Sequence, residues 1–144
     1  MSSIDFLGAS GTVTGSCYLY TSSTGTKILI DCGMYQGPSE IVDLNRHPLP
    51  EGLSSVSGMV LTHAHLDHCG RLPLLAQHHF SGPIYMTKPT RSLVELTLSD
   101  ALKIAEHEKD REQLFSETDL LKVLSLSKIV EYHQKFTIGE VEIE

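Results

Sequence analysis

The chain has few cysteines, no long apolar run and fewer basic than acidic side chains, and each shortage excludes a class of protein. Cys17, Cys32 and Cys69 are an odd set without zinc-ribbon spacing, so we expect free thiols in a reducing cytoplasm. No segment reaches the ~20 apolar residues of a membrane-spanning helix. The N-terminus also lacks the basic and then apolar pattern of a secretory signal. We therefore expect no membrane association.

Basic side chains are scarce, with 11 Lys and Arg against 18 Asp and Glu and a net charge of −7. This balance argues against a nucleic-acid-binding surface spread over the whole chain. It does not exclude a nuclease, because metal ions, backbone amides and a few local cations can also hold phosphate. Dinucleotide and nucleoside-triphosphate loops are not supported, since Gly8 to Gly15 contains neither G-x-G-x-x-G nor G-K-[ST].

Length and patterning indicate one mixed α/β domain with its elements in layers. At 144 residues and 40% apolar composition the chain is long enough to bury a core. Apolar and β-branched runs predict strands over Ile4–Leu7, Ser16–Thr21, Lys27–Asp31, a run ending at Leu61, Ile84–Met86, Ile129–Tyr132, Lys135–Ile138 and from Val141 onward. Helices are predicted over Leu72–His79, over Arg91–Lys109 with Thr90 as its cap, and over Leu120–Leu124 behind a cap at Ser116, with a possible helical turn at Glu40–Leu44.

The long predicted helix has apolar residues at helical spacing. These residues are Leu93, Leu96, Ala101, Ile104 and Ala105.

Four metal-ligand side chains lie within six positions directly after the apolar run Gly58–Leu61: His63, His65, Asp67 and His68. In an extended continuation of that strand, His63 and His65 point to the same side. A turn after Leu66 then brings Asp67 and His68 toward the same space. Two imidazoles and a carboxylate–imidazole pair suit two zinc ions that each keep a position open for water. The sequence therefore predicts a metal site at His63, His65, Asp67 and His68.

Three segments, in this order along the chain, resemble the β-CASP branch of the metallo-β-lactamase superfamily, which comprises RNA- and DNA-processing nucleases. They are Leu7 to Cys17, Ile28 to Gly37 and Leu61 to Pro73. The resemblance implies the first half of an αββα sandwich and a zinc-dependent phosphodiesterase or ribonuclease. It also implies two zinc ions in the complete site and RNA as the partner.

The resemblance also suggests catalytic roles for two aspartates. It places Asp31 close to the metal site, hydrogen-bonded around the ligands; without it, Asp31 reads as a turn residue at the end of a strand. Asp67 would be both a metal ligand and the hydrogen-bond acceptor that holds the attacking water. The Gly8 to Gly15 loop would border the site, where its amides or the hydroxyls of Ser10, Thr12 and Thr14 meet substrate phosphate; it is equally well explained as a flexible turn.

Two further ligands of the family pattern, a histidine in a glycine-rich segment and a bridging aspartate, do not occur within these 144 residues, and neither does the inserted β-CASP domain. We therefore expect residues 1–144 to form a partial domain with partial metal occupancy and little activity of its own. We also expect a homodimer or higher oligomer, because half of a sandwich leaves an apolar face uncovered.

Three functional interpretations remain open at this point. The first is a zinc-dependent phosphodiesterase acting on RNA, or a fragment of one. The second is a small-molecule hydrolase of the same superfamily, such as a thioesterase or lactamase. The third is a catalytically incompetent half-domain that associates with itself or binds a partner.

Overall fold

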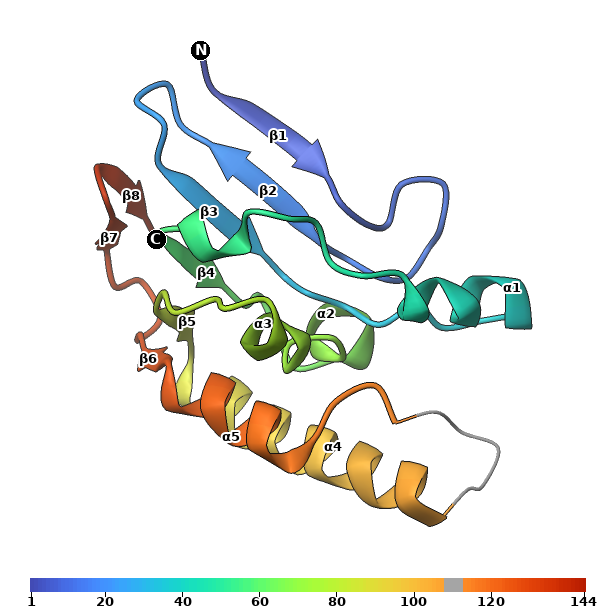
Figure 1. Ribbon diagram of the computed structural model, residues 1–144. Helices are drawn as coiled ribbons and strands as arrows, with labels where there is room; N and C mark the ends of the chain where they lie inside the picture. The colour runs from blue at the N-terminus through green and yellow to red at the C-terminus, as the bar shows by residue number, and fades with distance from the viewer. Residues whose placement is uncertain (108–112) are drawn as a thin grey trace.

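The computed structural model describes residues 1–107 and 113–144, and a six-stranded sheet lies at its centre (Figure 1). The strands follow one another across the sheet as β1 (Ser3–Phe6), β2 (Tyr18–Thr21), β3 (Lys27–Ile30), β4 (Gly58–Val60), β5 (Ile84–Met86) and β6 (Ser127–Ile129). β1, β2 and β3 are antiparallel, whereas β3 to β6 are parallel to one another. A separate antiparallel hairpin is formed by β7 (Phe136–Ile138) and β8 (Val141–Ile143).

One predicted strand lies at the wrong place. The β-branched run Ile129–Tyr132 was expected to be extended, but β6 is Ser127–Ile129. The pairing begins immediately after a helix, because the Ile84 N–H donates to the Leu126 carbonyl at 3.0 Å. Tertiary pairing with β5 therefore overrides the weak strand propensity of Ser127 and Lys128.

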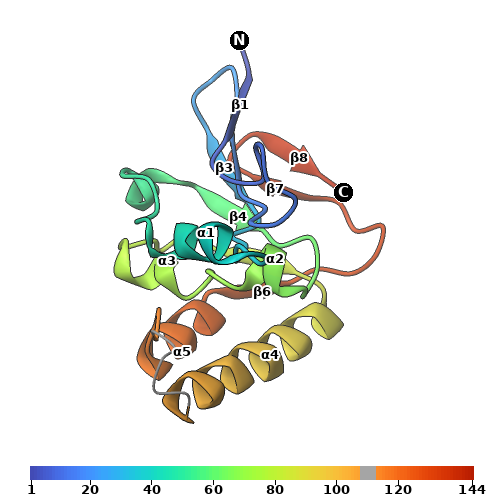
Figure 2. The same ribbon diagram turned by 90° about the vertical axis from the view of Figure 1, so that its right-hand side faces the viewer.

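The helical elements connect the strands. They are α1 (Ser39–Val42), the 3₁₀ turns η1 (Asp43–Arg46) and η2 (Leu53–Ser55), α2 (Leu66–Cys69), α3 (Leu74–Gln77), α4 (Lys88–His107) and α5 (Glu117–Ser125). Residues of α3, α4 and α5 join the core beside the sheet. α4 and α5 lie side by side in both views (Figures 1 and 2). In Figure 2, α3 lies to one side of β3 and β4, and the β7–β8 hairpin lies to the other. None of the helices in the described residues is long and apolar enough to span a membrane.

The main core lies between the sheet and the helices. Leu29, Met59 and Ile84 are neighbours in register on one sheet face, and all three are buried. They belong to one apolar cluster with residues of α3, α4 and α5, among them Leu75, Val94, Leu98, Leu120 and Val123. Burial of each such side chain contributes roughly 1.5–3 kcal/mol, so this layer fixes the positions of the strand ends.

The long helix buries a different stripe from the one that the spacing of Leu93, Leu96 and Ile104 indicates. Val94, Leu98 and Leu102 are its buried residues, while Leu93 is 53% and Leu96 67% exposed. Both stripes have helical spacing, and only the position of the sheet decides between them.

The ends of two predicted helices also need correction. α4 begins at Lys88, and its cap is Thr87, whose hydroxyl lies 3.4 Å from the Thr90 N–H; its predicted end at Lys109 lies outside the described residues. The predicted helix Leu72–His79 is regular only over α3, directly after Pro73. The α5 cap is confirmed, because Ser116 and Asp119 form a reciprocal capping box.

The second sheet face is only partly covered. Tyr85 on this face stacks on Phe136 of the hairpin, with ring centroids 4.5 Å apart. A cavity of about 270 Å³ remains between sheet and hairpin, lined by Tyr20, Ile28, Ile30, Val60, Val141 and Ile143. Toward the edge strand, Ile4 is 54% and Phe6 66% exposed. The apolar surface expected on this face is therefore present in part.

The hairpin is attached to the β2–β3 turn by the side chain of Glu140. The hydroxyls of Ser22, Thr24 and Thr26 all donate to its carboxylate. These hydrogen bonds lower the pKa of Glu140 to about 2. The turn between β7 and β8 is made at Gly139, which has φ 58°.

Candidate metal centre

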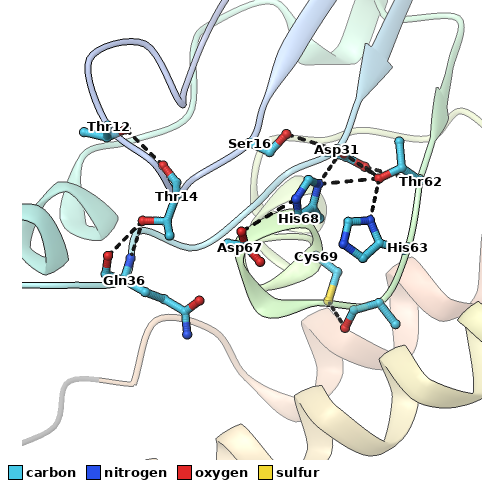
Figure 3. Close-up of polar contacts among 11 residues, drawn as sticks. Thr12, Thr14, Ser16, Asp31, Gln36, Thr62, His63, Asp67, His68 and Cys69 are labelled. Carbon is cyan, nitrogen blue, oxygen red and sulfur yellow. Dashed lines mark hydrogen bonds and ion pairs between the residues drawn. The ribbon is translucent and has the colours of Figure 1, made fainter.

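The four predicted metal ligands lie at the carboxyl ends of β3 and β4. Ile30 of β3 and Val60 of β4 are in register, so the residues that follow these parallel strands emerge side by side. Asp31 comes from β3, and the segment from Thr62 to His68 comes from β4. Figure 3 shows Asp31, Thr62, His63, Asp67 and His68 gathered at this edge.

The segment after β3 holds the metal-ligand segment through backbone hydrogen bonds. The Cys32 N–H donates to the His68 carbonyl at 2.9 Å, and the Met34 N–H donates to the Leu66 carbonyl at 2.8 Å. The Ser16 N–H, from the loop after β1, donates to the Asp67 carbonyl at 2.8 Å. Gly33 permits this approach, since a Cβ at that position would lie 1.7 Å from the Asp67 carbonyl oxygen. Two separate segments, Cys32–Met34 and the loop that contains Ser16, therefore hold the backbone of α2.

The three imidazoles form one contiguous cluster. The ring of His63 lies 4.7 Å from that of His65 and 4.0 Å from that of His68, measured between centroids. The Asp67 carboxylate faces the same cluster, 3.6 Å from His68 Nε2. The side chains of His63, Asp67 and His68 are partly exposed, and His65 is exposed, so the cluster is open to solvent.

The side chains of this cluster are of the chemical kinds that bind zinc. Imidazole nitrogen and carboxylate oxygen are the ligands of hydrolytic zinc sites. Within residues 1–107 and 113–144, however, no three His, Cys, Asp or Glu side chains converge on a point that would hold a metal ion. The rings contact one another instead, so binding of an ion would require them to rotate apart. Metal binding at these residues stays a prediction.

Asp31 is the buried acceptor of the site. Its carboxylate is 2.7 Å from His68 Nδ1 and 2.9 Å from the Thr62 backbone nitrogen, and it accepts from the Ser16 hydroxyl at 3.3 Å. The side chain is only 3% exposed. Asp31 also has φ 59°, a left-handed conformation that costs a non-glycine residue about 1–2 kcal/mol. The surrounding contacts hold Asp31 in this strained conformation against the histidines.

Other predicted neighbours of the site take structural positions. The Thr12 hydroxyl donates to the Thr14 carbonyl at 3.0 Å, and the Thr14 hydroxyl donates to the Gln36 carbonyl at 2.9 Å. Both protons are therefore used inside the protein and are not free for a phosphate. Cys69 is fully buried, and burial raises the pKa of its thiol to about 12, so Cys69 is a packing residue beside the site.

The sequence interpretation missed Ser16 and Thr62 as partners of Asp31. The Thr62 hydroxyl lies 2.9 Å from Asp31 Oδ2 and 3.0 Å from His63 Nδ1. The position of Thr62 in the sequence could have indicated its role, because Thr62 lies between the end of the strand and the first histidine of the predicted metal site. Nothing in the local sequence links Ser16 to Asp31, since their contact depends on the pairing of β2 with β3.

Comparisons with known proteins give one consistent result. A family model described as the metallo-β-lactamase superfamily matches residues 10–134. The chain is 38% identical over 136 residues to ribonuclease TTHA0252 of Thermus thermophilus, covering 94% of this chain and 30% of that protein. It is 40% identical over 106 residues to the transcription termination factor FttA of Methanocaldococcus jannaschii, covering 73% of this chain and 16% of that protein.

A third relative supports the same grouping, and a solved structure shows the same fold. The chain is 32% identical over 142 residues to cleavage and polyadenylation specificity factor subunit 3-II of Arabidopsis thaliana, covering 93% of this chain and 22% of that protein. It therefore spans less than a third of the length of these curated relatives. Among solved structures, it resembles MEM-A1, a subclass B3 metallo-β-lactamase from a soil metagenome library, with a TM-score of 0.53, 18% identity and coverage of 90% and 44% of the two chains.

Proposed function

Because this chain belongs to the metallo-β-lactamase superfamily, we propose that it carries the zinc-binding part of a phosphodiesterase that cleaves RNA. The observation that supports this proposal most directly is the grouping of four side chains at one strand end, with Asp31 buried behind them. These side chains are His63, His65, Asp67 and His68. The relatives support the substrate class, since they are named as a ribonuclease, a transcription termination factor and a subunit of a cleavage and polyadenylation factor.

Different residues of this chain would have different roles in the proposed reaction. His63, His65, Asp67 and His68 would hold zinc, two ions in the complete site, with partial occupancy in this chain. Zinc supplies Lewis-acid chemistry there, which makes water a better nucleophile and offsets charge that develops on a phosphate. Asp31 accepts the Nδ1–H of His68, which leaves Nε2 of that ring available as a ligand. The Asp67 carboxylate is a hydrogen-bond acceptor for the attacking water.

The excess of acidic over basic side chains limits the part of this chain that RNA would contact. With a net charge of −7, contact would be confined to the metal centre and to nearby backbone amides rather than spread over the surface. The three cysteines are free and buried, which supports our proposal that the chain works in a reducing cytoplasm.

Metal analysis of the purified chain tests the proposed ligands. We expect substoichiometric zinc or manganese in the wild type and none in the double variant His65→Ala, His68→Ala. The exposed histidines His47 and His133 provide the matched control, because their replacement by alanine removes the same side chains at a distance from the site. Equal metal content in the two double variants would contradict the assignment.

Cleavage assays test the reaction. We expect no more than trace metal-dependent cleavage of RNA by the isolated chain, and loss of that trace in Asp67→Asn. Parallel assays with a thioester and a β-lactam test the small-molecule alternative, which gains support if these substrates are hydrolysed and RNA is not. Robust RNA cleavage that Asp67→Asn leaves intact would refute the role of Asp67.

The exposed sheet face favours a second proposal, self-association. Ile4 and Phe6 are 54% and 66% exposed on the edge strand β1, and unpaired apolar edges recruit other chains. Light scattering at micromolar concentration should give a homodimer or a higher oligomer. The double variant Ile4→Ser, Phe6→Ser should lower the molar mass, while Val13→Ser, at a 97% exposed loop position, should not. A wild-type monomer would refute this proposal.

A further inference from the structure

The hydroxyl of Thr62 lies between the buried carboxylate and two of the proposed ligands. Its oxygen is 3.0 Å from Asp31 Oδ1 and 2.9 Å from Asp31 Oδ2. It is also 3.0 Å from His63 Nδ1 and 3.4 Å from His68 Nδ1. Asp31 reaches His68 directly at 2.7 Å, whereas the contact with His63 passes through Thr62.

Counting protons leaves one consistent arrangement for these contacts. A carboxylate only accepts, so His68 Nδ1 must carry a proton in its bond to Asp31. The Thr62 hydroxyl has a single proton. If that proton pointed at His63, the hydroxyl oxygen would face both carboxylate oxygens at about 3 Å with no proton between them, which is a repulsive contact. The proton is therefore donated to Asp31, and the Thr62 oxygen accepts from His63 Nδ1–H.

We propose that Thr62 is a positioning residue that extends the control of Asp31 to His63. Through its hydroxyl, one carboxylate fixes two imidazoles in the Nδ1–H tautomer, so that both present an Nε2 lone pair toward the cluster. The tautomer assignment stands on hydrogen-bond geometry alone, while its consequence for zinc rests on the proposed function. Outer hydrogen bonds of this kind typically change metal affinity by about 10- to 100-fold.

Two substitutions separate the hydroxyl from the shape of the side chain. Thr62→Val keeps the branched shape and removes the oxygen, and Thr62→Ser keeps the oxygen and removes a methyl group. Thr137→Val is the matched control, because Thr137 is exposed on β7, far along the chain from the site. All three are compared with the wild-type chain.

The first measurement is the tautomer of His63 in the metal-free protein, by long-range ¹H–¹⁵N correlation of labelled histidine near pH 8.5. We expect Nδ1–H in the wild type, in Thr62→Ser and in Thr137→Val, and loss of this preference in Thr62→Val. The second is zinc affinity by competition with a chromophoric chelator. We expect a decrease of roughly tenfold for Thr62→Val and near wild-type binding for Thr62→Ser.

The outcomes distinguish the two proposals. An Nε2–H tautomer at His63 in the wild type overturns the role of Thr62, and this result needs no variant to fold. An unchanged Nδ1–H tautomer in folded Thr62→Val overturns it as well. If the wild type shows the expected tautomer but binds no zinc, the positional role survives and the proposed metal function fails.

Discussion

Replacement of Asp31 by asparagine removes one buried charge from the centre of the site and preserves the size of the side chain. Asparagine also tolerates the left-handed backbone that Asp31 adopts at φ 59°, unlike most residues. The substitution therefore tests the acceptor chemistry of Asp31 without adding backbone strain. Because the side chain is 3% exposed, water cannot replace the hydrogen bonds that the substitution removes.

The magnitude follows from the number of donors that face Asp31. The Thr62 N–H, the Thr62 hydroxyl, the Ser16 hydroxyl and His68 Nδ1 surround the two carboxylate oxygens, and asparagine offers only one oxygen. If that oxygen faces Thr62, the amide NH₂ faces His68, which can then accept only as the Nε2–H tautomer. Hydrogen bonds to a charged group contribute about 1.5–3 kcal/mol each, and relief of the buried charge offsets part of the loss. We expect unfolding to become easier by about 2 kcal/mol and zinc affinity to fall ~10- to 100-fold.

Urea denaturation of the metal-free protein and chelator competition for zinc measure these two effects separately. Asp43→Asn is the control, since Asp43 is exposed and its ion pair with Arg46, at 3.3 Å, lies on the surface, where such pairs contribute about 0–1 kcal/mol. The reasoning is refuted if Asp31→Asn matches Asp43→Asn both in unfolding midpoint and in zinc affinity.

Two further predictions concern backbone packing and pH. Gly33→Ala should destabilise the protein by about 3 kcal/mol, because the new Cβ meets the Asp67 carbonyl oxygen. Gly25→Ala has nothing within 4 Å of its new Cβ and costs only the backbone strain of its φ of 98°, about 1–2 kcal/mol. Equal unfolding midpoints in urea for the two variants would contradict this. Three hydroxyls lower the pKa of Glu140 from its ordinary 4.5 to about 2, so its contribution to stability is present above about pH 5 and is lost as pH falls toward 2. Glu140→Gln should reduce this acid dependence of the unfolding midpoint, and parallel pH curves for the two proteins would argue against it.

The sequence predicted the sheet and the positions of the site residues because those signals are local. Apolar runs such as Ile28 to Ile30 specify strands wherever they pair, and His63 to His68 are close in the chain, so their proximity in space follows from one turn. The buried stripe of α4 was not predictable in the same way. Leu93 and Leu96 are as apolar as Val94 and Leu98, and only packing against the sheet decides which pair is buried.

The features of the site that the sequence did not predict depend on contacts between residues far apart in the chain. Ser16, Asp31 and Thr62 meet only because β2, β3 and β4 are adjacent, and no spacing rule in the sequence encodes their hydrogen bonds. The resemblance placed Asp31 near the ligands, but its left-handed backbone at φ 59° is seen only in the structure. Zinc binding, catalysis and self-association stay predictions.

The backbone hydrogen bonds that join the Cys32–Met34 segment to α2 have a consequence for local opening of the protein. The amides of Ser16, Cys32 and Met34 donate to carbonyls of Asp67, His68 and Leu66, respectively, so α2 with Asp67 and His68 cannot separate from the sheet edge unless these bonds break together. Amide hydrogen exchange at Ser16, Cys32 and Met34 should then be as slow as in the central strands, although the imidazoles themselves are open to solvent. The side chains can rotate toward a ligand while the backbone beneath them opens only with the fold as a whole.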